Sequence, residues 1–160
     1  MIEVSTYVFA GRAYHPIAEL HTPVADPDYI KGAIELSIDG VDIITRAEWD
    51  LVDQLWAYLV NGACELASGR SFATRFPDQP IELLFTAGEH DDGVTVEIRY
   101  RGVGRPAKAR VGRRELIVAI ADAAEPVFTK LLELAPSNRA GYEAVLRQIE
   151  SLMRSTSGSS

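Results

Sequence analysis

Three histidines and one cysteine are the side chains of this 160-residue chain best suited to act as neutral-pH bases, nucleophiles or soft metal ligands. His21 lies near two aspartates and His90 lies within an acidic run, but neither spacing matches a zinc or EF-hand pattern. Cys64 falls at the border of an apolar helical stripe, with no basic neighbour to activate it. We therefore expect no catalytic residue, no metal site and no cofactor, and we expect folding without a metal.

Seven basic residues and no acidic residue occupy positions 99–114, in a chain whose net charge is −7. Clustered arginines can hold an anion or a phosphate backbone. An acidic chain repels a polyanion elsewhere, and only Tyr100 could stack on a base, so nucleic acid is not an expected partner. We expect these cations to pair with carboxylates of neighbouring strands. The alternative is a small-ligand or enzymatic anion site formed by Arg99, Arg101, Arg105, Lys108 and Arg110.

Acidic residues are in excess between positions 39 and 53, where Arg46 is the one basic residue. A helix dipole or a turn explains individual carboxylates, but neither explains the excess. A negative surface accelerates encounter with a positively charged partner. We therefore predict a surface for a basic protein partner, formed by Asp39, Asp42, Glu48, Asp50 and Asp53.

Alternating apolar residues predict the strands that position these groups in the first part of the chain. Residues 2–10 read as a strand, and residues 11–28 read as a loop unless 17–22 form a short strand. Residues 34–44 predict a hairpin, because Asp39-Gly40 tolerates positive φ in a two-residue turn.

A central helix is predicted from Thr45 to Ser68. Thr45 and Glu48 have the spacing of a capping box, and Gly69 provides the stop. Trp49 and Trp56 then lie on one apolar face, and we expect both to be mostly buried. Asp50 falls on the opposite, solvated face.

The second part of the chain predicts more strands and two helices. Strands are expected at residues 72–76, 81–86, 94–100 and 107–111, with a turn at the Gly-Val-Gly segment 102–104. Helical spacing follows at 113–134, where Pro126 should kink or divide the helix, and a last helix begins after Pro136.

The predicted fold class is α+β, with antiparallel hairpins around a central amphipathic helix and two helices closing the C-terminal end. Residues 1–154 should form one domain and residues 155–160 a disordered polar tail. A single cysteine and the lack of a leader indicate a cytoplasmic protein, and the lack of a long apolar run indicates that it does not cross a membrane. The arginine-rich composition favours a bacterial source. At the level of class alone, such a chain is similar to immunity proteins, which neutralise toxins. That similarity implies a protein-binding module and not an enzyme.

Overall fold

The computed structural model describes residues 1–158, and within them the chain forms two antiparallel sheets and three α-helices. Strands come first, then one helix, then strands, then two helices, which confirms the predicted α+β class. None of the helices in this described part of the chain has the length and apolar content to span a bilayer.

Sheet A is built from the first half of the chain. Its strand order is β2-β1-β3-β4, and the short β5 pairs with the start of β3. The β3–β4 turn has positive φ at Asp39 and Gly40, as the two-residue hairpin predicted. The strands are β1 (Ile2–Ala10), β2 (Ala13–Pro16), β3 (Lys31–Ile38), β4 (Val41–Ile44) and β5 (Asp50–Leu51).

Sheet B is a meander in the order β6-β7-β8-β9. Alternate residues of β7 and β8 are buried, so one face belongs to the core and the other carries polar and charged side chains. The strands are β6 (Phe72–Arg75), β7 (Ile81–Ala87), β8 (Gly93–Tyr100) and β9 (Ala107–Gly112).

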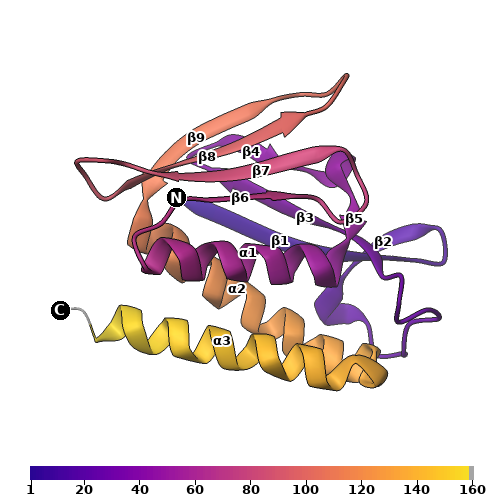
Figure 1. Ribbon diagram of the computed structural model, residues 1–160. Helices are drawn as coiled ribbons and strands as arrows, with labels where there is room; N and C mark the ends of the chain where they lie inside the picture. The colour runs from indigo at the N-terminus through magenta and orange to yellow at the C-terminus, as the bar shows by residue number, and fades with distance from the viewer. Residues whose placement is uncertain (159–160) are drawn as a thin grey trace.

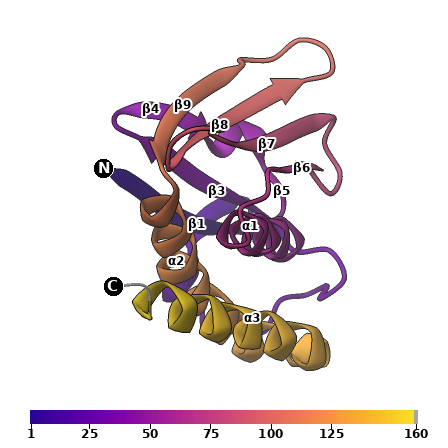
Figure 2. The ribbon, with the colours of Figure 1, turned by 60° about the vertical axis from the view of Figure 1, so that its left-hand side comes forward.

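The helix α1 lies at the centre, with sheet B on one side and the α2–α3 pair on the other (Figure 1). Figure 2 shows α1 nearly end-on, with sheet A beside it. The α-helices are α1 (Val52–Ala67), α2 (Arg113–Leu134) and α3 (Arg139–Ser157), and short 3₁₀ turns form η1 (Ile17–Glu19), η2 (Arg46–Glu48) and η3 (Pro136–Asn138).

The two tryptophans lie in different environments. Trp56 is 1% exposed in α1, and its indole Nε1 donates to Thr6 Oγ1 at 3.0 Å. Trp49 lies before the helix and is half-buried, with the Lys31 ammonium 4.2 Å from its ring centroid. The expected burial is confirmed for Trp56 and is only partial for Trp49.

The central helix begins later than predicted. The capping box of Thr45 and Glu48 forms, but it caps η2, after which the chain extends through β5 and starts α1 at Val52. Asp50 and Leu51 form backbone pairs with β3, and this pairing prevents the helical conformation that their local sequence favours. Gly69 ends the helix with positive φ, as predicted.

Three smaller expectations also change. The segment expected as a loop contains β2, and α2 is not divided at Pro126. The last helix, α3, extends through Ser157, so the first residues of the expected tail are helical, while residues 159–160 lie outside the described part.

Candidate functional site

The predicted acidic surface is divided by the fold. Asp39 lies in the β3–β4 turn against the amino group of Met1, and Asp42 is exposed on β4. Glu48 is 3% exposed, and its carboxylate accepts from the Thr45 backbone N–H at 3.0 Å. The carboxylate of Glu48 also lies 3.6 Å from the Arg105 guanidinium. Glu48 therefore joins η2 to the β8–β9 turn and does not face a partner.

Asp50 corrects the prediction most strongly, because it is 1% exposed. Its carboxylate accepts backbone hydrogen bonds from Leu51 at 2.7 Å, Asp78 at 3.0 Å and Gln79 at 2.9 Å. Asp53 in turn accepts a hydrogen bond from the Tyr142 hydroxyl at 2.7 Å. Asp50 is thus buried and not on a solvated helix face as predicted, and reversing the charge of Asp50 and Asp53 would disrupt the fold.

Most of the basic run is paired within the chain. Arg99 lies 3.1 Å from Glu97, Arg101 lies 3.7 Å from Glu82, and Arg110 pairs with Asp91. Lys108 stands opposite Glu97 in the β8–β9 register. The expected pairing with a neighbouring strand is seen for Arg101 and in the register of Lys108, whereas Arg99 pairs within β8 and Arg110 pairs with the β7–β8 loop.

The histidines and the cysteine do not form a reactive cluster. Within residues 1–158, no group of three or more His, Cys, Asp and Glu side chains is placed to hold a metal ion. Burial, with a smaller contribution from Glu65, raises the pKa of the Cys64 thiol, which disfavours the nucleophilic thiolate.

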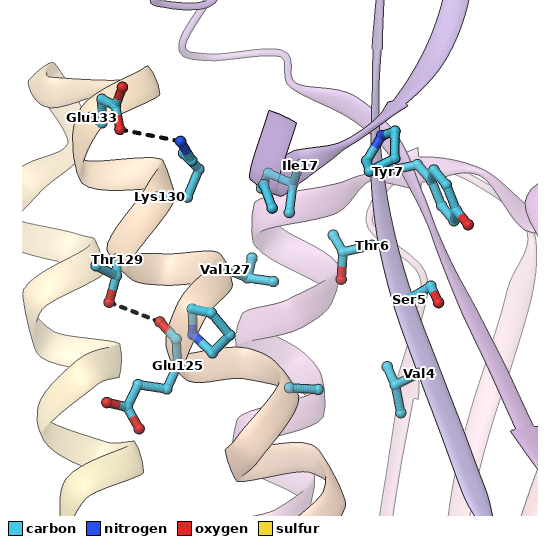
Figure 3. Close-up of a pocket in the computed structure, with 14 residues that line it drawn as sticks. Val4, Ser5, Thr6, Tyr7, Ile17, Glu125, Val127, Thr129, Lys130 and Glu133 are labelled. Carbon is cyan, nitrogen blue, oxygen red and sulfur yellow. Dashed lines mark hydrogen bonds and ion pairs between the residues drawn. The ribbon is translucent and has the colours of Figure 1, made fainter. Parts of the chain in front are cut away.

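A groove of about 740 Å³ lies between β1 and α2. Its volume is in the range of ligand-binding sites, about 300–1,000 Å³. Figure 3 shows Val4 and Thr6 on the helix side of β1, facing Val127, with Ile17 above them, while Ser5 and Tyr7 point away. The floor of the groove is therefore mainly apolar.

The helix wall of the groove carries short side chains. Ala123, Pro126 and Thr129 line it. The Thr6 hydroxyl at the floor is fixed by the hydrogen bond from Trp56. Side chains of α2 and of β1 therefore form opposite sides of the groove.

One wall of the groove is an unpaired strand edge. β2 pairs only with Tyr7–Ala10 of β1, whereas β3 pairs along the other edge from Ile2 onward. Within the described chain no strand pairs with the free edge of residues 2–6. Unpaired N–H and C=O groups on such an edge can pair with another chain.

The hairpin geometry identifies the backbone groups on this edge. The two-residue Gly11-Arg12 turn makes Ala10 and Ala13 its closing hydrogen-bonded pair, so even residues of β1 face the β2 edge. By the same alternation, the N–H and C=O groups of Val4 and Thr6 face the groove.

The Ile17 end of the groove is neutralised within the chain. There Lys130 is 14% exposed, and its ammonium lies 3.3 Å from Glu133 and 3.2 Å from His21 Nδ1. The Glu125 carboxylate is exposed and has no ion-pair partner among the described residues, but it points away from β1 (Figure 3) and borders a second hollow with Glu150 and Arg154 of α3.

Sequence reasoning did not identify this site. Its free edge exists because β2 ends at Pro16, in a segment that reads as loop. Proline is tolerated on an edge strand where its missing N–H faces away from the partner strand, as at Pro16 opposite Tyr7, so Pro16 is the one local signal that β2 is an edge strand. Comparison with protein-family models, with curated proteins and with solved structures found no match to the chain.

Proposed function

We propose that this chain is a protein-binding module that receives an extended segment of a partner protein as an added strand beside β1. The observation that carries the proposal is the free edge of residues 2–6, which borders an open apolar groove. Strand addition of this kind obtains affinity from backbone hydrogen bonds and specificity from pockets for alternate side chains.

The partner in this proposal is a protein with a basic surface. The chain carries a net charge of −7, which would steer a positively charged partner toward it. An immunity-type protein of the bacterial cytoplasm that neutralises a basic partner is the specific form of this role. Asp39, Asp42 and Asp53 could add long-range attraction, while Glu48 and Asp50 are buried.

The alternative of an anion-binding or enzymatic domain has less support. Its residues Arg99, Arg101, Arg105 and Arg110 each lie within 4 Å of a carboxylate in the same chain. An anion would have to compete with these pairs.

The test removes one edge hydrogen-bond donor. Val4→Pro deletes the N–H that faces the groove and leaves the pairing of β1 with β3 in place, while Val4→Ala removes side-chain volume but keeps that N–H. A phage-displayed library of random seven-residue peptides should yield binders to the wild type and to Val4→Ala that are lost on Val4→Pro.

Amide hydrogen exchange of the wild type gives a second measurement that needs no variant. Bound peptide should slow exchange at the Val4 and Thr6 amides, because each would donate to the added strand. Selected peptides that leave both amides unprotected, or that bind Val4→Pro equally well when the variant is folded by circular dichroism, would overturn the proposal.

A further inference from the structure

The outer face of sheet A borders the free edge of β1. Figure 3 shows the Ser5 and Tyr7 side chains pointing away from α2, and strand alternation places Glu3 on the same outer face. Val4 and Thr6 carry the free backbone groups, so they would form the hydrogen-bonded pairs of an antiparallel added strand. Glu3 and Ser5 would then form the closer, non-hydrogen-bonded pairs, in which the α-carbons lie about 4.5 Å apart. Outward side chains of the added segment would therefore contact those of Glu3 and Ser5.

Carboxylates follow Glu3 and Ser5 across this outer face. Directly opposite residues of neighbouring strands share a face, and Ser5 lies opposite Glu35 of β3. Glu3 lies opposite Ser37, which in turn lies opposite Asp42 of β4. The two rows of outward side chains that begin at the free edge therefore contain the carboxylates of Glu3, Glu35 and Asp42.

The cations on this face leave one of these carboxylates unpaired. The Arg46 guanidinium pairs with Glu35 at 3.0 Å. The Lys31 ammonium lies at the other end of the face, 4.3 Å from the ring centroid of Phe9, which is paired with β2. Glu3 is exposed, and it has no ion-pair partner in the part of the chain that the structure describes. Glu3 is therefore free to pair with a cation of an added strand.

We infer that the segment bound beside β1 carries a lysine or arginine at the outward-facing position opposite Glu3. This inference rests on the proposed function and specifies the chemistry of its partner. Opposite charges on directly facing residues of neighbouring strands attract and like charges repel, so Glu3 selects a basic segment over an acidic one. The exposed Asp42 in the same row adds attraction at longer range.

Three capped peptides of seven residues test the inference. The first alternates lysine and valine and has lysine at both ends, so its lysines face outward when its valines face the groove. The second replaces every lysine by glutamate. The third has the composition of the first but holds its valines together in the middle, which removes the alternation. Dissociation constants are measured at physiological salt by following the Val4 and Thr6 amide signals of isotope-labelled protein in NMR titrations.

Two charge reversals complete the comparison. Glu3→Lys changes the residue that we pair with the segment, and Glu89→Lys makes the same change in net charge on the exposed β7–β8 loop. Both glutamates are exposed, so both variants should keep the wild-type fold. Glu89→Lys is therefore the matched control for the general effect of net charge.

Glu3→Lys should weaken binding of the alternating lysine peptide about three- to ten-fold and strengthen binding of the glutamate peptide, because an attraction across the strand pair becomes a repulsion and the reverse. Glu89→Lys should change each affinity by less than about two-fold, because an exposed charge that does not contact the peptide is largely screened at this salt concentration. The alternating lysine peptide should also bind the wild type more tightly than the peptide whose valines are together.

The outcomes separate the inference from the proposed function. Equal effects of Glu3→Lys and Glu89→Lys, or equal affinities of the two lysine peptides, would overturn the inference while the Val4 and Thr6 amides still respond to peptide. Failure of every synthetic and phage-selected peptide to affect those amides would remove the proposed function and the inference together.

Discussion

The carboxylate of Asp50 organises two segments that are distant in sequence. It accepts the backbone N–H groups of Asp78 and Gln79, and the Gln79 side chain donates in turn to the carbonyl of Trp49 at 2.7 Å. Carboxylate acceptors of backbone N–H groups make strong, charge-assisted hydrogen bonds. Asp50 is therefore the residue that fixes the β6–β7 turn onto the start of α1.

Replacing Asp50 by alanine should lower the free energy of unfolding by about 3 kcal/mol, because buried N–H groups lose their acceptor. Asp50→Asn, which keeps one acceptor oxygen, should cost less. Asp42→Ala is the control, since Asp42 is exposed, and it should change stability by no more than about 0.5 kcal/mol. Urea denaturation measures all three. Equal effects of Asp50→Ala and Asp42→Ala would contradict the structural role.

At the scale of elements, the contact between α1 and sheet B depends on a missing side chain. Gly62 lies in α1, and a β-carbon there would come within 2.7 Å of the Phe85 ring and 2.8 Å of the Phe72 ring. Glycine in a helix interior is unfavourable relative to alanine, so its presence here reflects close packing of the helix on the sheet.

Gly62→Ala and Gly141→Ala should consequently change stability in opposite directions. Gly62→Ala should lower the free energy of unfolding by about 1–3 kcal/mol, because the packed rings must move. Gly141→Ala in α3 meets no atom within 4 Å and should raise it by up to about 1 kcal/mol through helix propensity. Thermal or urea unfolding provides the measurement. Stabilisation by both substitutions would show that the rings yield easily.

The open edge of β1 belongs to the same scale. This edge is unpaired because β2 ends at Pro16 and the chain then turns into η1, which places Ile17 at one end of the groove. A longer β2 would have filled the position that we assign to a partner segment.

At the scale of the whole molecule, two tyrosine–carboxylate pairs connect distant parts of the chain. Tyr142 of α3 donates to Asp53 of α1, and Tyr100 of sheet B interacts with Glu48 of η2. Burial, followed by the hydrogen bond to the carboxylate, raises the pKa of both phenols above the ordinary value of about 10.

These raised pKa values predict a loss of stability at alkaline pH. The unfolded chain releases the phenolic protons near pH 10 and the folded chain holds them to higher pH, so their contribution is complete below pH 10 and decreases above it. The double variant Tyr100→Phe, Tyr142→Phe should be less stable at neutral pH and should lose less stability from about pH 9 to 11. Urea midpoints against pH measure both effects. Parallel curves for wild type and variant would contradict the assignment.

The sequence by itself determined the elements whose signals are local. Alternation and turn chemistry predicted β1, the β3–β4 hairpin and the strands of sheet B, because side-chain period and positive-φ tolerance are properties of adjacent residues. Helical spacing predicted α2, and a glycine at position 69 predicted the stop of α1. The frequency of cross-strand charge pairs favoured pairing of the basic run with carboxylates of neighbouring strands over an anion site.

Only the tertiary structure decided which polar groups are buried and which backbone groups are free. Asp50 has the sequence context of a solvated helix residue, yet its burial depends on Asp78 and Gln79, which approach it from the β6–β7 turn. The free edge at Val4 and Thr6 depends on which strands meet β1 and how far each extends. Both depend on contacts between residues far apart in the chain. The periodicity of adjacent residues does not predict such contacts.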